Sequence, residues 1–179
     1  MFPHELFQQG IMMSISFTRR NLALSLGMAA IVAAAGVAPA DTGKPILTIS
    51  GKVGAASGAS FDRDALEKLG LVSFETTTPW HTGKVKFEGI PLKVLMKHVA
   101  ASGNTVQALA LNDYSTDIPM EDFEKYNVIL ALKRNGEYMP VRDKGPLFIV
   151  YPYDSKPELK SQTYYGRSAW QLKRLEVTE

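Results

Sequence analysis

The order of strand-like and helix-like segments is the feature that most constrains the fold of this chain. After Asp41, segments with β-branched or alternating apolar residues outnumber helical segments, and the two kinds do not alternate regularly. A regular alternation would predict a doubly wound parallel sheet, whereas this order favours an α+β domain with mainly antiparallel or mixed sheets. We expect about seven strands with two or three short helices.

Seven segments have the composition or the alternation of strands. They are Pro45–Val53, Leu71–Thr77, Lys84–Glu88, Val106–Asp113, Asn127–Val141, Gly145–Pro152 and Ala169–Val177. The dipeptide Asn135–Gly136 predicts a tight hairpin turn inside one of them. The glycine- and serine-rich run at 54–60 predicts a flexible turn.

Three further segments have helical features. A short helix is predicted to begin at Asp62 and to end at Gly70, because aspartate favours a helix start and glycine tolerates positive φ at a helix end. The clearest helix runs from Pro91 to Gly103. Its apolar residues share one face, which we expect to be core: Leu92, Leu95, Met96 and Val99. Residues 119–126 predict one short helical turn.

The first forty residues have the pattern of a signal peptide, so we exclude residues 1–40 from the fold and assign the domain to 41–179. Arg19 and Arg20 precede an apolar run over Asn21–Val37, and Ala38–Ala40 gives a small-residue cleavage pattern. An uncleaved signal anchor is the alternative, but this run is short and diluted for a bilayer span. The arginine pair suits both a Sec and a twin-arginine signal. We expect a periplasmic protein with no stable membrane span after cleavage.

Composition excludes several classes of function. The chain has no cysteine, which removes disulfides, thiolate nucleophiles, iron–sulfur clusters and cysteine-based zinc sites. Its 20 basic and 18 acidic residues give a net charge of +2, which leaves no electrostatic signature of a nucleic-acid partner. We expect a small molecule or a periplasmic protein as partner instead.

Familiar catalytic motifs are missing from the sequence. It contains no G-x-S-x-G, H-E-x-x-H, Walker A or G-x-G-x-x-G pattern. His98 lies off the apolar face of its helix and is predicted to be solvated. His81 follows Pro79–Trp80 at a strand break, where functional loops tend to lie, although a lone histidine is more often structural than catalytic.

The segment "TYYGRSAW" gathers aromatic residues late in the chain. With Arg167 it could form a wall for a planar or anionic ligand. The simpler interpretation, which the residues alone favour, is that Trp170 is core and that the tyrosines cover a long loop.

Four segments in order resemble the molybdopterin-binding oxidoreductase domain of the sulfite oxidase type. They are "TTTPW…FEGIPLKVLM", "ALNDYSTDIP", "VILALKRNGEYMPVRDKGPLFIVYP" and "YYGRSAWQLKRLEV", and together they span Ile46 to Val177. The resemblance implies that family's fold. In its catalytic members a cysteine thiolate upstream of the "GIPL" turn binds molybdenum, and alignment puts Thr76, or Thr77, at that position. A hard, neutral hydroxyl does not replace a soft thiolate.

The resemblance also implies a set of cofactor-binding positions in this chain: Thr76, Trp80, His81, Tyr114, Arg142 and Arg167. For the anionic end of a pterin cofactor the candidate cations are Lys84, Arg142, Lys144 and Arg167, although solvated surface is the favoured interpretation for any single one of them. We predict no catalytic or metal-ligand residue. Molybdopterin is a possible cofactor, but none is assigned.

Two functional hypotheses follow. The first is an exported, non-redox member of this fold that binds a small ligand or acts as a partner or sensory protein. The alternative is a molybdopterin-dependent oxidoreductase in which the pterin alone holds the metal.

Overall fold

The computed structural model describes residues 43–179 of the protein. The predicted leader at residues 1–40 and its cleavage site lie outside the described residues. No helix within residues 43–179 has the length and apolar character needed to span a membrane.

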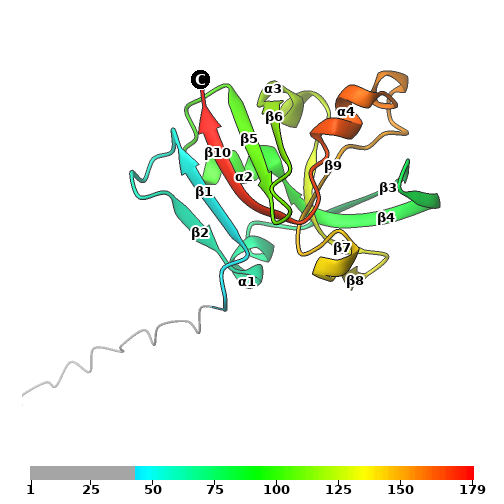
Figure 1. The fold of residues 1–179 in the computed structure, drawn as a ribbon, viewed down its shortest axis with the longest axis horizontal. Helices are drawn as coiled ribbons and strands as arrows, with labels where there is room; N and C mark the ends of the chain where they lie inside the picture. Colours follow the sequence, from blue (N-terminus) through cyan, green and yellow to red (C-terminus); the bar gives the residue numbers. More distant parts are fainter. Residues whose placement is uncertain (1–42) are drawn as a thin grey trace, which may run out of the picture. The chain divides into compact units, whose positions relative to one another are not determined.

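The first sheet is mixed and has five strands in the order β2-β1-β10-β5-β6 (Figure 1). Its strands are β1 (Leu47–Gly51), β2 (Ala59–Phe61), β5 (Thr105–Ala110), β6 (Ser115–Pro119) and β10 (Leu172–Thr178). β1 and β10 pair in parallel, and the other neighbours are antiparallel. The first and last strands of the domain therefore lie side by side inside the sheet.

The second sheet is antiparallel. Its strands are β3 (Val72–Thr78), β4 (His81–Pro91), β7 (Ile129–Arg134), β8 (Glu137–Tyr138) and β9 (Phe148–Val150). They follow the order β3-β4-β7-β8, with β9 also paired to β7. Asn135 and Gly136 connect β7 and β8 with φ angles of 51° and 87°, which confirms the predicted hairpin turn.

Short helices connect the strands at the ends of the sheets. They are α1 (Arg63–Glu67), α2 (Leu92–His98), α3 (Glu121–Lys125) and α4 (Gln162–Arg167), with single 3₁₀ turns η1 (Val141–Asp143) and η2 (Pro157–Leu159). The Asp62 side chain accepts a hydrogen bond from the backbone N–H of Ala65 at 2.7 Å, so it caps α1 as predicted. This set of sheets and short helices confirms the expected α+β class.

Helix α2 is shorter than the sequence predicts. It ends at His98 and not near Gly103, because Ala100 takes a left-handed φ of 49°. The backbone beyond it is bonded to the β1–β2 connection, where the N–H of Gly54 donates to the carbonyl of Val99 and the N–H of Ser102 donates to Lys52. These tertiary hydrogen bonds replace the last helical turn.

Helix α4 differs from the sequence-based expectation. The tyrosines of "TYYGRSAW" are predicted to cover a long loop, but residues 162–167 are helical and α4 packs near β6 and η2. Trp170 is partly buried and packs against the core cluster, so it lies at the edge of the core and not in its interior. The sequence signal for a helix is weak here because the segment is one turn and a half long and contains Gly166.

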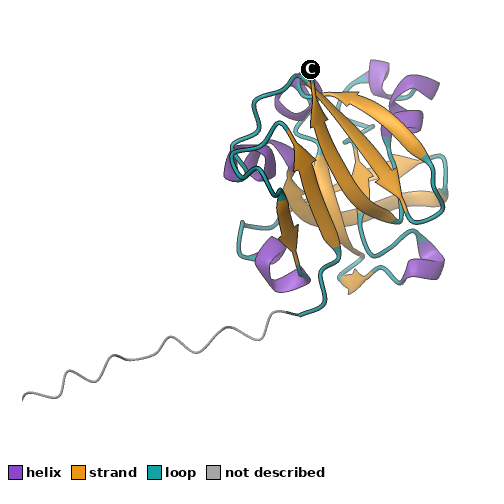
Figure 2. Ribbon diagram, turned by 60° about the vertical axis from the view of Figure 1, so that its left-hand side comes forward, coloured by secondary structure: helices purple, strands orange, loops and turns teal. Residues whose placement is uncertain are grey.

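One hydrophobic core joins the two sheets, whose strands cross one another in Figure 2. Leu47, Ile49 and Leu175 from the first sheet and Phe87 and Ile90 from the second belong to the same buried cluster. The alternation of buried and exposed residues along β1, β5 and β10 matches a sheet with one face on the core and one in solvent.

Candidate functional site

Trp80 lies at the tip of the β3–β4 hairpin, and local hydrogen bonds hold it there. Thr78 and His81 are paired across the tip, which leaves only Pro79 and Trp80 in the turn. The Thr78 hydroxyl oxygen lies 3.3 Å from the backbone N of Trp80, which donates to it, and 2.8 Å from His81 Nδ1. The sequence "TPWH" thus builds a tight turn that presents an indole ring.

Four aromatic rings surround the Trp80 indole. Their ring centroids lie 5.3–6.2 Å from that of Trp80, and all four meet it edge-on: Phe148, Tyr153, Tyr165 and Trp170. Edge-to-face contacts are a favoured geometry for aromatic pairs. The cluster connects the β3–β4 hairpin of the second sheet to α4 and to the segment that leads into β10 of the first sheet.

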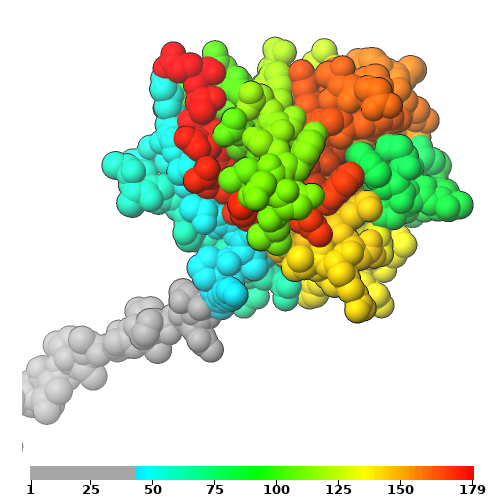
Figure 3. All heavy atoms as spheres, viewed as in Figure 1, coloured from blue at the N-terminus to red at the C-terminus, as the bar shows by residue number. Residues whose placement is uncertain are grey.

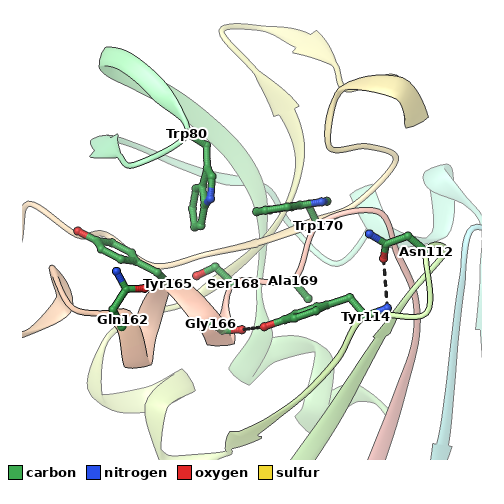
Figure 4. A pocket seen from close by; sticks show the side chains of 9 residues that line it. All are labelled: Trp80, Asn112, Tyr114, Gln162, Tyr165, Gly166, Ser168, Ala169 and Trp170. Atoms are coloured by element: carbon green, nitrogen blue, oxygen red, sulfur yellow. Dashed lines mark hydrogen bonds between the residues drawn. The ribbon is translucent and has the colours of Figure 1, made fainter.

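A cavity of about 250 Å³ lies beside this cluster (Figure 4). It is built from the β3–β4 tip, the β5–β6 turn, α4 and the α4–β10 connection. The lining residues are Trp80, Asn112, Tyr114, Gln162, Tyr165, Gly166, Ser168, Ala169 and Trp170. None of these side chains carries a charge at neutral pH, so the cavity is aromatic and neutral.

Polar groups of the cavity differ in what they offer to a ligand. Within residues 43–179 neither indole N–H of Trp80 or Trp170 has a hydrogen-bond partner. The Asn112 side-chain oxygen accepts from the backbone N–H of Tyr114 at 3.2 Å, which leaves its amide NH₂ to donate elsewhere. The Tyr114 hydroxyl is already used, because it donates to the Gly166 carbonyl at 2.6 Å. The cavity is therefore richer in donors than in acceptors.

His81 does not line this cavity. Its Nε2 accepts from Arg134 Nη1 at 3.0 Å, which makes Nδ1 the protonated nitrogen that donates to Thr78. Arg134 is itself held by a bidentate pair with Asp143, at 2.5 and 3.1 Å. Partial burial, and then the neighbouring Arg134 guanidinium, lower the pKa of His81 below 6.5. A neutral His81 thus supports the turn that presents Trp80.

Thr76 is fully buried and does not line the cavity either. Its hydroxyl accepts from the backbone N–H of Asp154 at 3.1 Å and donates to the Thr77 carbonyl at 3.3 Å. Thr77 contacts the same loop, since its N–H and hydroxyl donate to the Asp154 carboxylate at 2.8 and 2.7 Å. Hydrogen bonds from Lys160 and then from Thr77 hold the pKa of Asp154 well below 3.8. Strand β3 is therefore clamped to the loop before η2.

Arg167 does not line the cavity. Its Nη1 donates to the carboxylate of Asp122 at 2.7 Å, and the Tyr151 hydroxyl donates to the same oxygen at 2.8 Å. Asp122 is only 3% exposed. Burial, and then the negative charge of Asp122, raise the pKa of Tyr151 well above its usual value of 10. Arg167 is thus the counter-ion of a buried carboxylate.

The other basic candidates also lie outside the cavity lining. Lys84 and Arg142 are exposed on β4 and η1. The Lys144 ammonium lies 5.0 Å from the ring centroid of Trp170, which is a lining residue. Of the six predicted cofactor-binding residues, the structure brings only Trp80 and Tyr114 into one cavity.

Several cavity residues are not among those predicted from the sequence. Asn112 belongs to the same segment as Tyr114, and Tyr165 and Trp170 belong to the "TYYGRSAW" segment, for which a ligand wall was the less favoured interpretation. The run of aromatic residues in "TYYGRSAW" was the feature of the sequence that could have identified Tyr165 and Trp170 as cavity residues. Nothing in the sequence shows that α4 turns this run toward Trp80, about ninety positions away.

These residues do not fit the metal-bearing, phosphorylated pterin that the resemblance implies. The resemblance places Thr76 or Thr77 at the thiolate position, and the hydroxyls of both already have partners on the protein. Residues 43–179 contain no cluster of His, Cys, Asp or Glu able to hold a metal ion. No cation lines the aromatic cavity to receive a phosphate, which proteins bind with Arg, Lys or backbone N–H groups.

Comparisons with known proteins agree with the resemblance at the level of the family. A family model described as "Oxidoreductase molybdopterin binding domain" matches residues 59–178. A search of curated proteins finds no match. The matched region contains every residue of the aromatic cavity.

Proposed function

Because the chain belongs to the family of oxidoreductase molybdopterin-binding domains, we propose that it is an exported, non-redox member that uses this scaffold to bind a small uncharged ligand. A fold does not fix a function, and a cofactor scaffold can outlast its chemistry. The observation that carries the proposal is the neutral aromatic cavity around Trp80, combined with the engagement of Thr76 inside the protein.

The cavity supports a ligand class. Indole and phenol rings supply apolar contact area, and about 250 Å³ suits a molecule of one or two rings. The indole N–H groups and the Asn112 amide favour carbonyl or ring-nitrogen acceptors on that ligand. A carboxylate or phosphate would leave water without finding a counter-ion in the lining, which is costly. We therefore expect an uncharged planar heteroaromatic molecule with acceptor groups.

Binding would position the ligand without chemical conversion. The Trp80 turn and α4 form the walls, and the Tyr114–Gly166 hydrogen bond joins the β5–β6 turn to α4. A ligand in contact with both the Trp80 turn and α4 would therefore link the β3–β4 hairpin, through α4, to the first sheet. That coupling supports a sensory or partner role in the periplasm, because occupancy would change the rigidity of the exposed tip.

Metal and pterin analysis of protein recovered from the periplasm of its native host tests the proposal first. We expect no stoichiometric molybdenum by elemental analysis and no pterin fluorescence after oxidation, with an N-terminus at Asp41. Stoichiometric molybdenum together with turnover of an oxo-anion or a sulfoxide would overturn the proposal. That result would favour the alternative, in which the pterin alone holds the metal.

Ligand binding is tested with quinolin-2-one as probe and a carboxylated quinolinone as matched charged analogue. We expect quinolin-2-one to bind and to quench the fluorescence of the two tryptophans, and we expect no quenching by the carboxylated analogue. Trp170→Ala should weaken the binding by about fivefold or more, since a stacked aromatic wall contributes about 1 kcal/mol or more. Tyr114→Phe should weaken it moderately by freeing the Gly166 carbonyl, whereas the exposed Tyr138→Phe serves as control. Equal binding of both probes would contradict the neutral-cavity argument.

A further inference from the structure

A second concave surface lies away from the aromatic cavity and shares no residue with it. This basic groove has a volume of about 820 Å³ and is formed by the segment entering β1, the end of β5, the loop around η1, the start of β10 and Arg63 of α1. Figure 3 shows the first residues of the domain, the β5–β6 turn and the η1 loop meeting on one face of the molecule.

The floor of the basic groove is apolar. It includes Ile46, Leu109, Leu172 and Pro146, together with Leu111 and Val141. Leu111 is 47% exposed and Val141 is 51% exposed, among the highest values for large apolar residues within 43–179. Single exposed apolar residues are ordinary, but two beside one concave floor indicate a surface that binds something.

The rim of the groove is basic. Lys44, Arg63, Lys173 and Arg174 line it, and no acidic residue does. Two of these cations have weak ion pairs, because Lys173 lies 3.1 Å from the highly exposed Asp113 carboxylate and Arg174 lies 3.7 Å from Glu176. Exposed pairs of this kind contribute little to stability and exchange readily for another carboxylate. Since the whole chain carries only +2, this concentration of basic residues is local.

We propose that the basic groove docks a short acidic segment of a partner protein that also carries apolar side chains. Charge complementarity supplies the first half of the argument, because the four cations of the lining outnumber the two exposed carboxylates paired with them, so the rim attracts acidic chains and repels basic ones. The apolar floor supplies the second half, because it needs aliphatic or aromatic side chains to cover Leu111 and Val141. The proposal does not depend on the ligand of the aromatic cavity.

The shape of the groove favours a protein segment over other polyanions. A flat basic face would suit anionic lipid headgroups, whereas this surface is an open but concave groove to which both the η1 loop and α1 contribute residues. A nucleic acid would need a longer basic track with stacking aromatics, and the groove lining has no aromatic residue. A polypeptide can fill a hollow of this size with side chains while its carboxylates meet the rim.

The test is a fluorescence-anisotropy titration of the protein purified after export. The probe is a short labelled peptide of alternating Glu and Leu, and the comparison peptides are alternating Lys–Leu and alternating Glu–Ser. We expect the Glu–Leu peptide to bind best, the Glu–Ser peptide weakly and the Lys–Leu peptide not at all. Binding of the Glu–Leu peptide should weaken as salt is raised.

Variants locate the binding surface. Lys44→Glu with Arg63→Glu should weaken binding of the Glu–Leu peptide by about tenfold or more. The matched control, Lys84→Glu with Lys97→Glu, makes the same change in net charge at exposed positions outside the groove and should change the affinity by less than about twofold. Leu111→Ser should weaken binding, whereas Leu71→Ser, at a similarly exposed leucine, should not.

Three outcomes would overturn the proposal. Equal loss of binding in the groove and control charge reversals would show a non-specific charge effect. Equal affinity for the Lys–Leu and Glu–Leu peptides would show that the groove has no preference for acidic segments. Binding of phosphatidylglycerol vesicles without binding of the Glu–Leu peptide would identify a membrane surface instead. Thermal unfolding of each variant shows whether it is folded, and failure of Arg63→Glu to fold would leave Leu111→Ser to decide.

Discussion

Thr76 is one of the two residues that the resemblance places at the thiolate position, and the structure shows that its hydroxyl is used inside the protein. Its side chain is completely buried, and its hydroxyl joins β3 to Asp154. This hydroxyl has two hydrogen-bond partners on the protein, and Thr76 does not line the aromatic cavity. The residue has a structural role, which a sequence alignment alone does not reveal.

His81 should make the stability of the protein depend on pH. Its pKa is lowered in the folded protein, so the unfolded chain binds more protons between that lowered value and 6.5. The stabilising contribution is therefore present above 6.5 and is lost as the pH falls through the folded pKa. We expect the free energy of unfolding, measured by urea titration at each pH, to fall as the pH is lowered from above 6.5 toward the folded pKa of His81.

The variant His81→Gln isolates this effect. Glutamine keeps an acceptor for Arg134 but does not titrate. The free energy of unfolding of the variant should therefore change less over the same pH range than that of the wild-type protein. If the free energy of unfolding depends on pH in the same way in the wild-type protein and in His81→Gln, titration of His81 is not the cause.

Arg167 and Asp122 should show strong energetic coupling. Arg167→Met leaves the buried carboxylate of Asp122 with only the Tyr151 hydroxyl, which should cost about 3 kcal/mol of unfolding free energy. Adding Asp122→Asn should restore much of that loss, because it removes the uncompensated charge. The measurement is a double-mutant cycle by chemical denaturation.

The exposed pair of Lys93 and Glu124 provides the control for this cycle. Its charged atoms lie 3.4 Å apart near the surface, so Lys93→Met should change the stability by less than about 1 kcal/mol. Additive effects of the Arg167 and Asp122 substitutions would show that the two side chains are not coupled.

At the scale of elements, the clamp between β3 and the loop before η2 holds the base of the Trp80 hairpin. Asp154→Ala removes the acceptor of two hydrogen bonds from Thr77 and should cost about 1–2 kcal/mol. The backbone N–H of Thr77 should then exchange faster with solvent, which hydrogen-exchange mass spectrometry measures directly.

The same clamp predicts that the stability of the protein depends on acid. The pKa of Asp154 is lowered, so its contribution to the free energy of unfolding is present above the ordinary value of 3.8 and disappears as the pH falls through the folded pKa.

The control for Asp154→Ala is Asp113→Ala, which removes an exposed carboxylate paired with Lys173 and should leave the hydrogen exchange of the Thr77 N–H unchanged. Equal protection of Thr77 in the wild-type protein and Asp154→Ala would rule out the clamp.

At the scale of the whole molecule, the aromatic cavity lies where the two sheets meet. Trp80 comes from the second sheet and Trp170 precedes β10 of the first, and they are the only tryptophans of the chain. Their fluorescence therefore reports whether the hairpin is docked. Because one core joins both sheets, we expect unfolding followed by tryptophan fluorescence and by far-ultraviolet circular dichroism to have the same midpoint. A lower midpoint for fluorescence would show that the hairpin undocks on its own.

The sequence by itself determined the local features whose causes lie within a few residues. Asp62 caps α1, Asn135–Gly136 makes the β7–β8 turn, and the irregular order of segments indicates an α+β fold. The absence of cysteine is enough on its own to exclude thiolate ligation by this chain. These conclusions are accessible because backbone preferences and residue chemistry act locally.

Only the tertiary structure decided which side chains meet. It directs Arg167 to a carboxylate 45 positions earlier in the chain, and it ends α2 early through hydrogen bonds to the β1–β2 connection. It also turns α4 so that Tyr165 and Trp170 face Trp80. The direction of a side chain depends on how its element packs against distant ones, and spacing along the sequence does not encode that packing.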